Sequence, residues 1–129
     1  MLSVRLFLIV QILTLTGFGL AYFVRPQETA NLSGMLLMAP AALTDVRAYY
    51  GGLQLGLAAW LGLALLQGDL LRPALMLLVL LYSALFLARL GGLWLDGGAQ
   101  QTFNLYAMLF EGVSAALAFW LLRGRSAAA

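Results

Sequence analysis

Long apolar runs without charge most constrain what this chain can fold into. The first extends from Leu6 to Val24, 19 residues without a charged side chain, and comparable runs recur toward the C-terminus. About 20 apolar residues in a helix span the ~30 Å hydrocarbon core of a bilayer. Only 9% of the residues are charged, whereas a soluble domain has about 25%. The sequence therefore predicts an all-α integral membrane protein.

Turn and capping residues divide the chain into four predicted spanning helices. A single transmembrane domain over residues 1–129, built as a four-transmembrane-helix bundle, would have its helices at 6–24, 45–66, 73–95 and 103–122. Pro26, Pro40 and a turn at Asn31–Gly34 interrupt the first connection. Thr44 or Asp45 is expected to cap the second helix, because short polar side chains favour that position.

The positions of the arginines predict the orientation in the membrane. Four spans place both termini on one side. That side holds Arg5, Arg72, Arg123 and Arg125, and the opposite side holds Arg25 and Arg47. Because the side richer in arginine faces the cytoplasm, we expect both termini to be cytoplasmic.

The residue types that are missing exclude several classes of function. The chain has no Cys and no His, which excludes disulfides, thiol redox chemistry, imidazole catalysis and haem ligation by His or Cys. Its seven basic residues are all Arg and are scattered singly, so binding to nucleic acid is not expected. The sequence predicts no metal site, no cofactor and no assigned catalytic residue.

Two opposite charges lie inside the predicted spans. A charge at the centre of a membrane helix costs about 2.5–3.5 kcal/mol on insertion scales, so such residues face the protein interior and find partners. At 1.5 Å per residue, Arg89 lies about 9 Å, Glu111 about 12 Å and Gln54 about 10 Å below the outer ends of their helices. Three polar side chains on three helices are therefore expected at one depth, facing one another.

These side chains predict a polar pocket in the outer half of the membrane. The expected members are Asp45, Arg47, Tyr50, Gln54, Tyr82, Arg89, Asn104 and Glu111. The alternative is an Arg89–Glu111 ion pair that only fixes the register of two helices. Two series of small residues are expected to let helices pack closely, namely Ala48, Gly52 and Gly56, and Ala84, Ala88 and Gly92.

One run of residues carries a family resemblance. Residues 47–52 read Arg-Ala-Tyr-Tyr-Gly-Gly, followed by Gly56, and Arg89, Asp96-Gly97 and Glu111-Gly112 complete the pattern. This pattern resembles domain-of-unknown-function family 4345, small four-helix bacterial integral membrane proteins. The resemblance implies a four-helix domain of the bacterial cytoplasmic (inner) membrane, without an established activity. The small four-helix architecture is also similar to that of DoxX-like proteins, but a shared architecture does not imply a shared function.

Three functions are compatible with the pocket. The first is a non-enzymatic module that binds a small lipophilic or amphiphilic ligand with an anionic head (a lipid, a quinone or a fatty acid), held by Arg47 and Arg89 and balanced by Glu111. The second is an accessory or assembly subunit of a larger membrane complex, or a homo-oligomer. The third is a lipid-modifying isomerase that uses Glu111 as acid or base, with Tyr50 or Tyr82 as proton donor. Arg89 opposes this third role because it favours the charged carboxylate.

Overall fold

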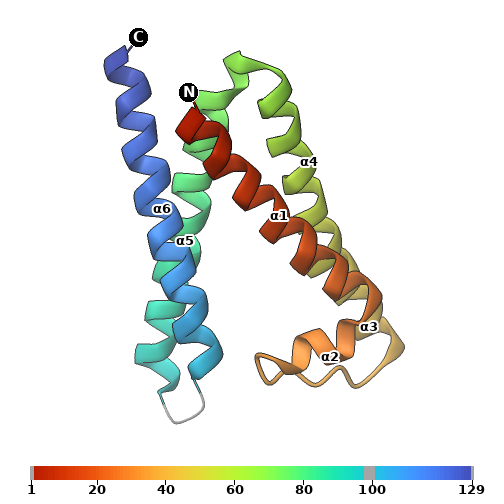
Figure 1. Ribbon diagram of the computed structural model, residues 1–129. Helices are drawn as coiled ribbons and strands as arrows, with labels where there is room; N and C mark the ends of the chain where they lie inside the picture. Colours follow the sequence, from red (N-terminus) through yellow and green to blue (C-terminus); the bar gives the residue numbers. More distant parts are fainter. Residues whose placement is uncertain (1, 98–100, 129) are drawn as a thin grey trace. The chain divides into compact units, whose positions relative to one another are not determined.

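The computed structural model describes residues 2–97 and 101–128, and every regular element among them is a helix (Figure 1). Four helical stretches are long and apolar enough to cross a membrane: Leu2–Val24, Pro40–Leu66, Gly68–Asp96 and Thr102–Gly124. The predicted all-α fold with four transmembrane helices is therefore confirmed. By its internal contacts the chain divides into two compact units, Met1–Gly68 and Asp69–Ala129, and each is described by itself.

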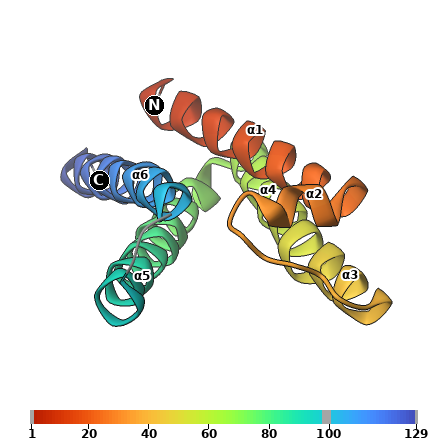
Figure 2. The same cartoon turned by 90° about the horizontal axis from the view of Figure 1, so that it is seen from below.

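The first unit is built around one long helix. It contains α1 (Leu2–Val24), α2 (Pro26–Asn31), α3 (Pro40–Val46), the π-helix η1 (Arg47–Gly52) and α4 (Leu53–Leu66). α1 packs along η1 and α4, and the two views of Figures 1 and 2 show α1 and α4 side by side. Arg5 at the start of α1 donates from Nη1 to Leu65 O at 2.7 Å. This bond satisfies one of the last carbonyls of α4, which have no partner within their own helix.

The second spanning segment begins at Pro40, earlier than the predicted start at residue 45. Pro40 is the first residue of α3 and Ala39 precedes it without a side-chain capping bond. Proline suits this position because its fixed φ is already helical and its missing N–H would have no partner there. Thr44 and Asp45 lie inside α3, so the prediction that one of them caps the helix is wrong.

A π-helix interrupts the second span over the run that carries the family resemblance. η1 covers Arg47–Gly52, and the N–H of Leu53 donates to Ala48 O, five residues earlier. An α-helix bonds four residues back, so η1 accommodates one extra residue in the turn. Gly51 and Gly52 lie in this widened turn, and paired small residues are common where helices deviate from α geometry.

The second unit is a helical hairpin. η2 (Gly68–Leu70) leads into α5 (Leu71–Asp96), which is followed by α6 (Thr102–Ala128). α5 and α6 pack along each other and run in opposite directions (Figure 1). Gly97 ends α5 with a φ of 56° and a ψ of −156°, a positive-φ conformation that glycine adopts because it has no Cβ.

Glycines allow close packing inside each unit, at positions other than those predicted. A Cβ on Gly51 would lie 3.1 Å from Gly19 O, and a Cβ on Gly112 would lie 3.2 Å from the Phe86 ring. A Cβ on Gly56, by contrast, would meet nothing within 4 Å. Within the first unit, the predicted packing series through Ala48, Gly52 and Gly56 therefore makes no such close approach. Gly51, the neighbour of Gly52 in η1, faces α1.

Candidate polar site on the α5–α6 hairpin

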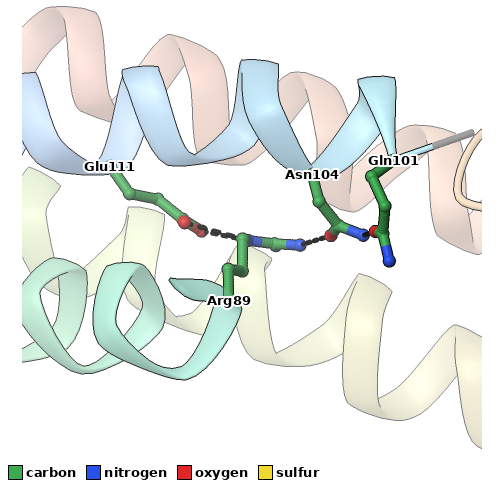
Figure 3. A network of polar contacts seen from close by, with 4 residues as sticks. All are labelled: Arg89, Gln101, Asn104 and Glu111. Carbon is green, nitrogen blue, oxygen red and sulfur yellow. Dashed lines mark hydrogen bonds and ion pairs between the residues drawn. The ribbon is translucent and has the colours of Figure 1, made fainter. Parts of the chain in front are cut away.

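Arg89 and Glu111 form an ion pair that joins α5 to α6 inside the predicted spans. Nε of Arg89 donates to both carboxylate oxygens of Glu111, at 2.9 and 3.0 Å (Figure 3). The Glu111 side chain is 6% exposed and that of Arg89 is 28% exposed. The prediction that these two charges face each other is confirmed, and their common depth in the membrane stays a prediction.

A line of amide side chains continues from the arginine toward the α5–α6 loop. Nη1 of Arg89 donates to Asn104 Oδ1 at 2.7 Å, and Asn104 Nδ2 donates to Gln101 Oε1 at 2.7 Å. Gln101 Nε2 in turn donates to Gly97 O at 3.1 Å. Figure 3 shows Arg89 extending from α5 between Glu111 and Asn104 of α6. The guanidinium is thus held from two directions by residues of one helix.

Aromatic rings surround this network on α6. The guanidinium carbon of Arg89 lies 5.8 Å from the centre of the Phe103 ring, a distance at which a cation is attracted to the ring face. Tyr82 is buried and meets Phe110 edge to face, with ring centres 5.7 Å apart. The Phe103 ring thus adds a third contact to the guanidinium, besides those with Glu111 and Asn104.

A pocket of about 300 Å³ opens beside the arginine, within the hairpin. Its lining combines apolar, small and polar side chains: Leu85, Ala88, Arg89, Gly92, Leu93, Asp96, Gln101 and Asn104. Among the side chains described, those of residues 2–97 and 101–124, no group accepts a hydrogen bond from Nη2 of Arg89. One nitrogen of the guanidinium is therefore without a hydrogen-bond partner in this part of the chain, and Arg89 lines the pocket.

The predicted site residues of the first unit have local roles. Nη1 of Arg47 donates to Phe23 O, and its guanidinium carbon lies 5.9 Å from the centre of the Phe23 ring. Tyr50 stacks on Tyr22 with ring centres 5.2 Å apart, and Gln54 Nε2 donates to Tyr50 O at 2.8 Å. These three residues hold η1 against α1 or support it.

Asp45, the remaining predicted member, is exposed on α3. The eight predicted residues thus divide equally over the two units. A single pocket that joins all eight would have to lie between the two units, and it stays a prediction.

Two residues of the network were not predicted. Gln101 positions Asn104, and Phe103 lies against the guanidinium of Arg89. A signal for Gln101 was present in the sequence, since it lies three residues before Asn104 and such pairs are neighbours on a helix surface. No pattern in the sequence indicates which face of the Arg89 side chain an aromatic ring covers.

Four apolar helices and one ion pair that joins the last two of them define a helical membrane protein with a polar site within its spanning segments. The chain belongs to the family of the domain of unknown function DUF4345, which matches residues 3–122. No curated protein and no solved structure matches it significantly. Since the family has no assigned activity, function must be argued from the site.

Proposed function

We propose that this protein is a non-enzymatic module that binds a small amphiphile in the membrane and holds its head group through Arg89. The observation that carries the proposal is the geometry of that guanidinium. Glu111 and Asn104 fix two of its nitrogens, whereas no hydrogen bond is made by Nη2 to the described side chains, and Arg89 lines a pocket of about 300 Å³. Fixed donors bind a ligand well because little conformational freedom is lost on binding.

The composition of the pocket fits a molecule with two different ends. Leu85, Ala88 and Leu93 offer an apolar wall for a hydrocarbon tail, and Arg89 offers hydrogen-bond donors to an oxygen-bearing head. An arginine present only to fix helix register needs one carboxylate. The additional amides of Asn104 and Gln101 orient the guanidinium beyond that requirement.

The head group is proposed to bind Arg89 alone, and not a clamp of two arginines. Arg47 already donates to Phe23 O in the other unit. Glu111 balances the charge of Arg89, so the site does not demand a full negative charge. Phosphate, carboxylate and quinone oxygens all accept hydrogen bonds from a guanidinium, and each remains a possible head.

The hydrogen bonds that Glu111 accepts favour binding over catalysis. Both of its carboxylate oxygens accept hydrogen bonds from Nε of Arg89. A general base needs a lone pair directed at the proton that it removes, and here the lone pairs on the Arg89 side are occupied. We therefore propose that Glu111 positions Arg89 and does not transfer a proton.

Lipids that co-purify with the protein provide the test. Mass spectrometry should show that the wild type retains an amphiphile that the double variant Arg89→Leu with Glu111→Leu loses. The matched control is Arg25→Leu with Glu28→Leu, which removes an exposed ion pair of the first unit. The unfolding temperature of each variant in detergent shows that it is folded. Identical lipid profiles in all three folded proteins would contradict the proposal.

A further inference from the structure

The pocket beside Arg89 is lined by two opposite charges. Arg89 and Asp96 both line it and both belong to α5. Residues seven apart lie nearly on one face of a helix, at a separation of about 10 Å along its axis. A ligand on this face therefore meets a cation at one end and an anion at the other.

Glycine leaves the space over the helix between these charges open. Gly92 lies between Arg89 and Asp96 on α5 and lines the same pocket. Oδ2 of Asp96 is 3.7 Å from the position that a Cβ on Gly92 would occupy. The carboxylate of Asp96 is thus turned back along the helix, toward Arg89, and the missing side chain of Gly92 keeps the space between them open.

The two charges differ in how far they are already balanced. Glu111 forms an ion pair with Arg89, whereas Asp96 has no ion-pair partner among the described side chains of residues 2–97 and 101–124. An anionic head that approaches Nη2 of Arg89 would also approach this unbalanced carboxylate and be repelled. A head that carries a cationic group beyond its anionic group would instead neutralise Asp96.

We propose that the pocket selects a zwitterionic head group, with its phosphate or carboxylate on Nη2 of Arg89 and its ammonium group on Asp96. This inference rests on the proposed function and specifies the ligand class of the same site. A phospholipid with an ethanolamine head has this chemistry, and so does a soluble zwitterion such as phosphoethanolamine. The apolar wall of Leu85, Ala88 and Leu93 would contact the tail of the former.

Two short-chain lipids that differ only in the head group test the selection. The purified full-length protein in detergent is titrated with dihexanoyl phosphatidylethanolamine or dihexanoyl phosphatidylglycerol, and native mass spectrometry measures the bound fraction. We expect the wild type to bind the zwitterionic lipid about tenfold more tightly, the size of effect that one hydrogen bond to a charged group provides. Asp96→Asn should abolish this preference.

The control is Asp69→Asn, the same substitution at an exposed aspartate of η2 at the other end of the hairpin. It should leave the preference unchanged. Gly92→Leu fills the space between the charges and should weaken the binding of both lipids.

Failures of the two proposals can be told apart. Equal affinity for both lipids in the wild type, with both lost in Arg89→Leu with Glu111→Leu, would overturn the zwitterion inference and leave the proposed function standing. Equal affinity that survives the double substitution would overturn both. Free phosphoethanolamine distinguishes the source of the ligand: displacement of the lipid at equal concentration supports a soluble zwitterion, and lack of displacement supports the lipid.

Discussion

A charged residue inside a spanning helix is kept there by what surrounds it. Arg89 has Glu111, Asn104 and the Phe103 ring around its guanidinium. Removing one member of such a pair leaves a charge in a poorly solvating environment, which costs more than the pair contributes. The energetic role of the pair is therefore measured by single and double substitutions together.

Replacing one partner should destabilise the protein more than replacing both. We expect Glu111→Leu to lower the free energy of unfolding by about 3 kcal/mol, because Arg89 is then left without its carboxylate. The double variant Glu111→Leu with Arg89→Leu should recover most of this loss. Reversible unfolding in detergent provides the measurement.

The exposed pair of the first unit is the control for this cycle. Arg25 Nη1 lies 3.0 Å from Glu28 Oε2, and both side chains are about 70% exposed. Ion pairs on a surface contribute between 0 and about 1 kcal/mol to the free energy of unfolding. Glu28→Leu should therefore change the stability little. The expectation is contradicted if the double variant is less stable than Glu111→Leu alone. The loss of the ion pair, and not the isolated charge of Arg89, would then dominate the change in stability.

At the scale of elements, η1 and α1 meet through backbone. A Cβ on Gly51 would lie 3.1 Å from Gly19 O and 3.2 Å from Phe23 N, so no flexible side chain can move aside. Gly52 in the same turn has only Arg47 O nearby, at 3.9 Å. The two adjacent glycines therefore differ in what a methyl group would meet.

Gly51→Ala should destabilise the protein by about 1–3 kcal/mol, the usual cost of overpacking. Gly52→Ala should be neutral or slightly stabilising, since alanine favours helix more than glycine does. Unfolding temperatures of the two variants in the same detergent measure the difference. Equal loss in both would mean that the Gly51–Gly19 contact does not limit the packing of η1.

At the scale of the whole molecule, the number of spans decides the topology. Four spanning helices place both termini on one side of the membrane, and the arginine bias predicts that this side is cytoplasmic. Green fluorescent protein fused to either terminus should be fluorescent. Alkaline phosphatase fused after Gly97, in the α5–α6 loop, should be active. The reverse pattern of activities would invert the predicted orientation.

Much of the hairpin site could be predicted from depth and helical phase. Arg89 and Glu111 belong to neighbouring helices joined by a short loop. Their similar distances from that loop along the two helix axes bring them together. Arg47 and Tyr50 could not be placed in this way. Their neighbours Phe23 and Tyr22 come from α1, and the π-turn shifts the phase of the helix that carries them.

Sequence alone determined that this chain is helical, spans a membrane four times and holds an ion pair across its last two spans, because lipid admits helices and demands a partner for each charge. Tertiary structure decided which atoms remain available for function. Only packing shows that Nε of Arg89 donates to Glu111, that Nη1 donates to Asn104, and that Arg89 lines a pocket. Helix geometry follows from local residues, but which hydrogen-bond donors of a side chain are left without a partner depends on every neighbour that folding brings to it.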